Sequence, residues 1–175
     1  MIEYRIDLAD PAAHLFRVTL TVARPAASLI VSLPVWIPGS YLVREFARHL
    51  SGLAARQGGR AVGVEQLDKA SWRVDCRGAS TLTLAYDVYA FDPSVRAAWL
   101  DARRAFFNGT SLCLRVHGRE DEPQRLRLGP LPRGWQVATA LHGRARGGYE
   151  AADYDELVDH PVALGTFWRG SFTAG

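Results

Sequence analysis

The sequence predicts an all-β fold, either an antiparallel β-sandwich or a curved open-sheet domain, with one or two short helices. Three observations support this: apolar and polar residues alternate along most of the chain, turn-forming residues recur at short intervals, and few segments have helical periodicity. Strands with one buried and one solvated face produce such alternation. The 175 residues, 48% of them hydrophobic, suffice for one domain with its own core.

The alternating segments are the expected strands, and they cover residues 2–8, 16–22, 82–88, 112–116 and 135–141. Turn signals separate them at Asp10-Pro11, Arg24-Pro25, Gly58-Gly59, Asp92-Pro93, Asn108-Gly109, Gly129-Pro130 and Gly147-Gly148. Asn108-Gly109-Thr110 also matches a glycosylation sequon. Because Asn-Gly between two strand-like runs is a strong hairpin signal, we interpret it as a hairpin turn.

Two segments favour short helices. Ser40 is placed to cap a helical turn that carries Leu42, Val43 and Phe46 on one side. Asp153 is placed to cap a second helix over residues 153–158, with acidic residues in its first turn.

The stretch Leu33–Tyr41, LPVWIPGSY, interrupts the alternation with two prolines, a glycine and two large aromatic residues. Proline restricts φ and removes a backbone donor, and glycine adopts positive φ without strain. We expect Gly39 at positive φ, and we expect Trp36 and Tyr41 to bury apolar area where the chain changes direction. The stretch is interpreted as a structural corner.

Composition argues against several classes of partner. The net charge is only +3, and the arginines are dispersed and often alternate with apolar residues, so nucleic-acid binding is not expected. No apolar run approaches the ~20 residues of a membrane span, and the N-terminus lacks the regions of a signal peptide. A soluble, cytoplasmic protein is expected. Cys76 and Cys113 lie in strand-like runs, where we expect free core thiols, although a disulfide between them is not excluded.

The residues of the chain suggest no catalytic or metal site. The five histidines form no H-E-x-x-H or similar ligand pattern, and no G-x-S-x-G or phosphate-binding glycine loop is present. His160 after Asp159 is a candidate for acid–base or metal chemistry, but a polar loop residue ahead of Pro161 is the favoured interpretation. No catalytic residue, metal ligand or cofactor is therefore assigned to this chain.

One irregular segment is suggestive, residues 96–110, RAAWLDARRAFFNGT. A long irregular segment in a compact β-domain is often functional or interfacial. The alternative, weighted equally, is that the arginines are a solvated rim while Trp99, Phe106 and Phe107 plug one end of the sheets.

The C-terminal end has three aromatic residues within a short distance, Phe167, Trp168 and Phe172. Because chain ends are normally polar, these residues either fold back as a last strand or mark a boundary with another domain. We favour the boundary, which divides the chain into a β-domain of residues 1–165 and the start of a linker or strand, residues 166–175.

The run WIPGSYLVREFARHL (36–50) resembles the signature of the glycyl aminopeptidase family, PDZ-containing zinc metallopeptidases of the gluzincin type. The resemblance continues, collinearly and over essentially the whole chain, through LDKASWRV (67–74), YDVYAFDPSVRAAWLD (86–101), FFNGTSL (106–112), GWQVATAL (134–141) and DYDELVDHPVALGTF (153–167). It implies an N-terminal β-domain that precedes a zinc-binding catalytic domain and a PDZ domain.

The resemblance implies that zinc belongs to the absent catalytic domain and that this chain alone does not catalyse. Arg96, Asp101 and Asn108 become candidates for the rim of the peptide substrate cleft, and Phe167, Trp168 and Phe172 for the interface with the catalytic domain. In the wider clan this domain contributes a polar side chain that holds the substrate's free amine. Arg96 is nearest in register, but a cation cannot bind an ammonium group, so Asp101 is chemically better suited, while Arg96 suits a peptide carboxylate.

The second hypothesis is a free-standing β-sandwich that binds carbohydrate or protein. Its platform would be formed by Trp36, Tyr41 and Trp99.

Overall fold

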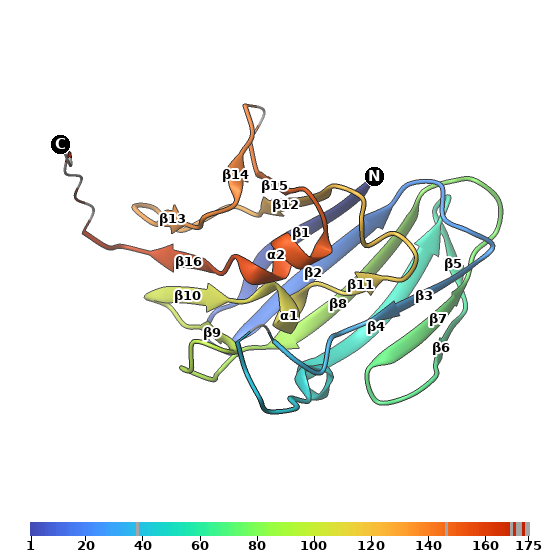
Figure 1. Ribbon diagram of the computed structural model, residues 1–175, viewed down its shortest axis with the longest axis horizontal. Helices are drawn as coiled ribbons and strands as arrows, with labels where there is room; N and C mark the ends of the chain where they lie inside the picture. The colour runs from blue at the N-terminus through green and yellow to red at the C-terminus, as the bar shows by residue number, and fades with distance from the viewer. Residues whose placement is uncertain (38, 146, 169, 171–172, 174–175) are drawn as a thin grey trace.

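The computed structural model describes residues 1–37, 39–145, 147–168, 170 and 173 (Figure 1). These residues form strands in three sheets, two short α-helices and one 3-10 turn. The all-β prediction with one or two short helices is therefore confirmed.

The largest sheet has eight strands in the order β14-β15-β12-β1-β2-β8-β4-β5. Its strands are β1 (Ile2–Asp10), β2 (Leu15–Val22), β4 (Leu50–Gln57), β5 (Arg60–Val62), β8 (Leu82–Tyr89), β12 (Gln124–Leu128), β14 (His142–Gly143) and β15 (Tyr149–Ala151). In β2 and β8 every second side chain is buried, as the alternation predicted. One face of this sheet therefore supplies a large part of the core.

One strand pair departs from the antiparallel expectation. β1 and β12 are parallel, with Ile2 opposite Gln124 and Ile6 opposite Leu128. Parallel neighbours need a connection that returns the chain to the same end of the sheet. Here the long stretch between β1 and β12 contains strands of both smaller sheets. The alternation of apolar and polar residues within each strand does not predict that two strands so far apart in the sequence are neighbours.

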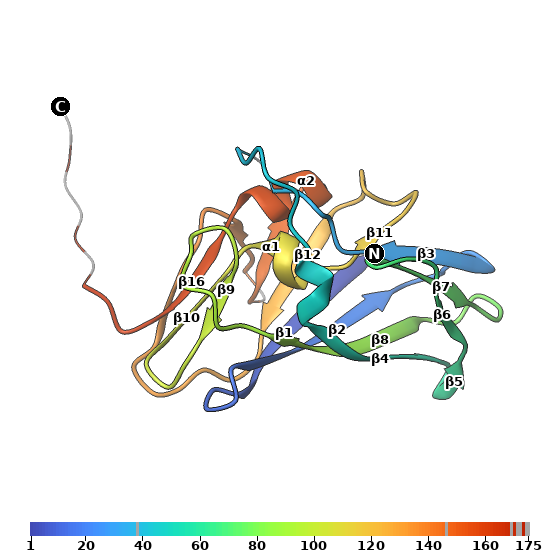
Figure 2. The ribbon, with the colours of Figure 1, turned by 90° about the horizontal axis from the view of Figure 1, so that it is seen from below.

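Two four-stranded sheets complete the fold. One has the order β11-β3-β7-β6, with β3 (Ser28–Ser32), β6 (Val64–Gln66), β7 (Ser71–Asp75) and β11 (Arg115–Val116). The other has the order β13-β16-β10-β9, with β9 (Ala98–Leu100), β10 (Arg104–Phe107), β13 (Gln136–Ala138) and β16 (Val162–Gly165). In Figure 2 they lie over opposite ends of the large sheet, with the helices α1 (Gly109–Leu112) and α2 (Tyr154–Asp159) between them.

A single cluster of buried apolar side chains joins these layers. It includes Tyr4, Phe16 and Tyr86 from the large sheet and Phe107 from β10. Cys76 and Cys113 are both buried and free, as expected for core thiols. Among the described residues, no helix is long and apolar enough to cross a membrane.

The helix predicted after Asp153 is confirmed. Asp153 is the N-cap of α2, and its carboxylate accepts a hydrogen bond of 2.7 Å from the backbone N–H of Glu156. The other predicted helix begins later than expected. The Ser40 hydroxyl accepts from Leu42 N at 3.4 Å, but the 3-10 turn runs over Phe46–His49, where the buried Phe46 side chain anchors it.

The predicted Asn108-Gly109 hairpin and the strand over residues 112–116 are wrong. Asn108 is the extended N-cap residue of α1, and only Arg115–Val116 form a strand. The physical reason is tertiary packing: a Cβ atom at Gly109 would lie 3.0 Å from the Leu157 carbonyl oxygen, so α1 and α2 pack with their backbones in close approach. A larger residue at this position would require α2 to shift by a few tenths of an ångström, so glycine suits this contact.

The interpretation of residues 33–41 as a corner is correct for the backbone and wrong for the aromatic side chains. Gly39 has φ +74°, in the region that favours glycine. Trp36 is 52% exposed and Tyr41 is 103% exposed. Pro38 lies outside the described residues. The segment therefore presents its aromatic side chains to solvent instead of burying them.

Candidate functional site

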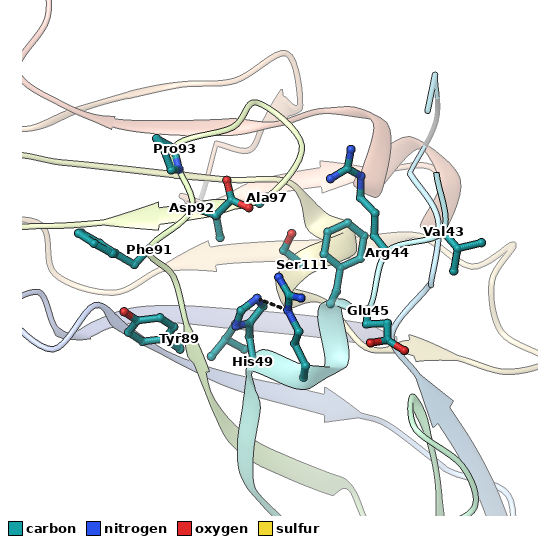
Figure 3. Close-up of a pocket in the computed structure, with 14 residues that line it drawn as sticks. Val43, Arg44, Glu45, His49, Tyr89, Phe91, Asp92, Pro93, Ala97 and Ser111 are labelled. Carbon is teal, nitrogen blue, oxygen red and sulfur yellow. Dashed lines mark hydrogen bonds between the residues drawn. The ribbon is translucent and has the colours of Figure 1, made fainter. Parts of the chain in front are cut away.

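A cavity of about 620 Å³ lies between the segment that precedes β4 and the loop that follows β8 (Figure 3). Its polar and charged lining includes Arg44, Glu45, Arg48, His49, Asp92 and Ser111. The apolar part of the lining is formed by Val43, Phe46 and Val88 and by the rings of Tyr89 and Phe91. The size falls in the usual range for small-ligand sites, ~300–1,000 Å³.

The first wall is positioned by main-chain contacts around the 3-10 turn. The backbone N–H of Arg44 donates to the Val35 carbonyl at 2.6 Å. Two residues later the Phe46 side chain is buried in the core. These two anchors hold the Arg44 and Glu45 side chains at the cavity edge.

The second wall is the loop between β8 and β9. The Asp92 carboxylate accepts from Ser94 N at 2.9 Å, which forms a tight turn. The buried Asn108 side chain donates to the carbonyl oxygens of Val95 at 2.8 Å and Ala97 at 3.3 Å. Because one amide holds the loop on both sides of Arg96, the loop has a defined shape without regular secondary structure.

His49 is neutral at the floor of the cavity. Arg48 Nε donates to His49 Nε2 at 3.0 Å, and because a guanidinium group only donates, this ring nitrogen carries no proton. Burial of the ring, followed by the positive charge of Arg48, lowers the pKa of His49, while Asp92 opposes the shift. His49 is therefore not a general acid at neutral pH.

A row of aromatic side chains, which we call the aromatic row, extends from the cavity along the surface and consists of Tyr89, Phe91, His14 and Trp99. Phe91 stacks on Trp99, with centroids 4.5 Å apart, and on His14 at 3.9 Å. The guanidinium carbon of Arg104 lies 5.5 Å from the Trp99 ring, a cation–π contact. Tyr89 and Phe91 are 44% and 48% exposed, so this row is accessible to a ligand or to another domain.

The structure separates the three predicted rim residues. Arg96 is exposed and lies between the two carbonyl groups that the Asn108 amide holds, whereas Asn108 itself is buried and acts on the loop backbone. Asp101 follows the far end of β9. Arg96 and Asn108 therefore belong to one loop structure, and Asp101 belongs to the next turn.

Both carboxylate oxygens of Asp101 are already engaged. One accepts from the backbone N–H groups of Arg103 and Arg104 at 2.7 and 2.8 Å, and the other accepts from Trp99 Nε1 at 3.0 Å. Burial opposes ionisation, but these hydrogen bonds outweigh it and lower the pKa of Asp101. Asp101 is thus an ionised organiser of the β9–β10 turn.

Two residues of the platform expected for the second hypothesis, Trp36 and Trp99, line different cavities. Trp36 lines a groove of about 1140 Å³ beside α2, whereas Trp99 belongs to the aromatic row and to a cavity against β10 and β16. Trp36 instead belongs to an exposed apolar segment, which we define as Val35, Trp36, Tyr41, Leu42 and Val43; these side chains are between 46% and 103% exposed.

The C-terminal aromatic residues also differ from one another. Trp168 is 89% exposed, whereas Phe167 is half-buried and lines cavities formed with β10, β13 and β16. Phe172 lies outside the described residues.

The described residues contain no group of three His, Cys, Asp or Glu side chains arranged to hold a metal ion. His160 Nδ1 lies 3.0 Å from the Glu156 carbonyl oxygen at the end of α2, a local contact that accounts for one ring nitrogen. The residues present in this part of the chain therefore do not fit a zinc site.

Sequence reasoning missed the charged residues of the cavity, Arg44, Arg48 and Asp92, together with Ser111. His49 is one of the five histidines, and no sequence pattern distinguishes it from the other four. Arg44 and Asp92 are 48 positions apart in the sequence, and no local sequence pattern indicates that their side chains line the same cavity. The available signal was the charged run VREFARH directly after an aromatic turn, which interrupts the period-two pattern.

Comparison with known proteins identifies the family. The model of the Peptidase M61 N-terminal domain matches residues 3–166. A structure of an aminopeptidase N family protein from Idiomarina loihiensis is similar with a TM-score of 0.90 and 41% identity; the match covers 94% of this chain and 29% of that chain. An M1 zinc metallopeptidase from Deinococcus radiodurans is similar in fold, with a TM-score of 0.55 and 14% identity, over 94% of this chain and 41% of that chain.

Comparison with curated proteins gives no significant match. The chain spans less than a third of the length of the Idiomarina protein. The family model covers almost the whole chain. The chain therefore belongs to the Peptidase M61 N-terminal domain family.

Proposed function

We propose that this chain is the non-catalytic N-terminal domain of a zinc-dependent aminopeptidase of the glycyl aminopeptidase type, which supports the catalytic domain and lines the substrate cleft. The observation that carries the proposal is the 41% identity over 94% of this chain to part of an aminopeptidase N family protein. Zinc, the catalytic residues and a PDZ domain belong, in this proposal, to the rest of the polypeptide. A cytoplasmic location is part of the same proposal.

The exposed apolar segment supports a domain that contacts another one. Val35, Trp36, Tyr41, Leu42 and Val43 are close in sequence, and all expose a large part of their side chains. Contiguous exposed apolar patches are uncommon on monomers and mark interaction sites. We propose that this segment and Trp168 contact the catalytic domain, together with Phe167 and Phe172.

The loop of residues 91–97 supports a role at the cleft. Asn108 holds its backbone, Arg96 is exposed within it, and the aromatic row with Arg104 lies beside it. Such a loop on a rigid scaffold is a common way to shape a substrate cleft. In this arrangement Arg96 interacts with an acidic or carboxylate group of the peptide, and Asp101 keeps the adjacent turn in shape.

The test compares the 175-residue chain with the full-length polypeptide. We expect the full-length protein to retain one zinc ion after dialysis and to hydrolyse glycyl and alanyl p-nitroanilides, and we expect the chain alone to do neither. In the full-length enzyme, Arg96→Ala should raise KM for peptides with little change in kcat, whereas Arg60→Ala, on the distant edge strand β5, should change neither. Zinc retention and turnover by the 175-residue chain would contradict the proposal.

A further inference from the structure

Two buried polar atoms at the cavity of Figure 3 have no hydrogen-bond partner among the described residues: Arg44 Nε and the Ser111 hydroxyl oxygen. Ser111 is only 4% exposed. A buried polar group without a partner typically costs ~1–3 kcal/mol, so native proteins rarely leave one in place without a role. In the view of Figure 3 the Ser111 hydroxyl points into the space flanked by Asp92 and Arg44.

The charges around these atoms favour an anion. Arg44 and Arg48 form no ion pair in the described part of the chain. Glu45 is neutralised by Lys69 at 3.0 Å, which leaves Asp92 as the uncompensated carboxylate of the lining. Two guanidinium groups against one carboxylate leave an excess of one positive charge, which a singly charged anion would balance.

The donors of this cavity suit a carboxylate. An Arg side chain binds a carboxylate through two parallel N–H donors, and Nε is one of them. The Ser111 hydroxyl adds a neutral donor. The remaining wall is apolar and aromatic, from Val43, Tyr89 and Phe91, and accommodates an apolar side chain.

We propose that this cavity binds a small monocarboxylate with an apolar or aromatic side chain, such as the C-terminal end of a short peptide, with Arg44 pairing with the carboxylate and Ser111 donating to it. The proposal rests on the cavity alone and does not depend on the proposed peptidase role. Binding of a carboxylate at Arg44 differs from binding of a ligand's ammonium group, which would instead pair with the Asp92 carboxylate in the same cavity.

The experiment titrates the 175-residue chain with three probes that share the phenylalanine side chain. They are N-acetylphenylalanine, which carries only a carboxylate, its neutral amide, and phenylalaninamide, which carries only an ammonium group. Binding is followed by calorimetry and by the side-chain Nε–H signal of Arg44 in ¹H–¹⁵N NMR spectra. We expect the carboxylate probe to bind and to shift this signal, and we expect the other two probes to bind at least about tenfold more weakly.

Variants separate this site from binding elsewhere. Arg44→Gln should weaken binding of the carboxylate probe by about tenfold or more, Arg44→Lys by less, and Arg60→Gln, which removes an exposed charge on β5, should have no effect. Ser111→Ala should weaken binding while the melting temperature of the free chain stays equal or rises, because no internal hydrogen bond is lost. Circular dichroism checks that each variant is folded.

Three outcomes would overturn the inference. Equal affinities for the acid and its amide would show that no carboxylate site exists, as would equal affinities of the Arg44→Gln variant and the unmodified chain. Preferred binding of phenylalaninamide would assign the cavity to an ammonium group at Asp92 instead. None of these results would affect the comparison of zinc content and turnover, so the two proposals fail separately.

Discussion

The hydroxyl group of Tyr86 donates a hydrogen bond of 2.6 Å to the carbonyl oxygen of Leu112, 26 residues further along the chain. The same hydroxyl accepts from Leu114 N at 3.2 Å, and Tyr4 and Tyr154 donate to the carbonyl oxygens of Leu114 and Cys113, both at 2.8 Å. Three buried tyrosines thus satisfy the backbone of residues 112–114 as it crosses the core. Burial raises the pKa of each tyrosine well above its ordinary value.

Replacing Tyr86 tests this network. Tyr86→Phe keeps the ring but leaves the Leu112 carbonyl and the Leu114 N–H without this partner, so we expect a loss of ~1–3 kcal/mol in the free energy of unfolding. Urea denaturation measures it. Tyr89→Phe is the matched control, because Tyr89 ends the same strand with its ring 44% exposed and should leave the midpoint unchanged. Identical midpoints for both variants would contradict the role assigned to Tyr86.

Gly39 tests the backbone of the exposed segment. Its φ of +74° is costly for any other residue, and no atom lies within 4 Å of a Cβ built there, so the cost is conformational alone. We expect Gly39→Ala to destabilise by ~1 kcal/mol in urea denaturation. The control is Gly63→Ala, at a position outside the positive-φ region where the added Cβ has an ordinary contact of 3.7 Å with Asp75. A larger loss at Gly63 than at Gly39 would rule out this explanation.

The two described C-terminal aromatic residues should respond differently to substitution. Trp168 is 89% exposed, so Trp168→Ser should leave the melting temperature unchanged and improve solubility. Phe167 is half-buried against β16 and its neighbours, so Phe167→Ser should lower the melting temperature modestly. Thermal melts and sedimentation measure both effects. A large destabilisation by Trp168→Ser would show that this residue packs within the domain.

The lowered pKa of Glu122 leads us to expect that the stability of the fold depends on pH. Hydrogen bonds from Arg119 lower its pKa to about 2 from an ordinary 4.5, with burial opposing and the N-terminal amine assisting. Because the folded pKa is the lower one, ionised Glu122 stabilises the fold fully above pH 4.5, and this contribution is lost as the pH falls toward 2.

Melts at several pH values check this sign. Glu122→Gln should lower the melting temperature at pH 7, and the difference from the unmodified chain should shrink below pH 4.5. Asp121→Asn is the control, since Asp121 forms no ion pair among the described residues. A difference that grows as the pH falls would have the wrong sign for a depressed carboxyl pKa.

Local physical chemistry made several features of this protein predictable. Period-two alternation in β2 and β8 reports which side chains face the core, because successive residues of a strand point to opposite faces. Asp153 caps α2 through a contact within four residues, and Gly39 adopts a conformation that other residues avoid. The resemblance of residues 36–50 and of later segments to a peptidase family likewise needed only the sequence, and the family match confirms it at the level of the Peptidase M61 N-terminal domain.

Tertiary structure alone decided the rest, because the interactions join residues far apart in the chain. Gly109 became part of a buried helix instead of a hairpin because it packs against the Leu157 carbonyl, and β1 gained a parallel neighbour in β12 after a long excursion through both smaller sheets. Exposure of Trp36 and Tyr41 depends on what surrounds the segment, not on its own residues. The cavity lined by Arg44, Asp92 and Ser111 also depends on long-range contacts. Three segments that are distant in the sequence form it together, and the pattern of residues within any one segment does not predict which others it contacts.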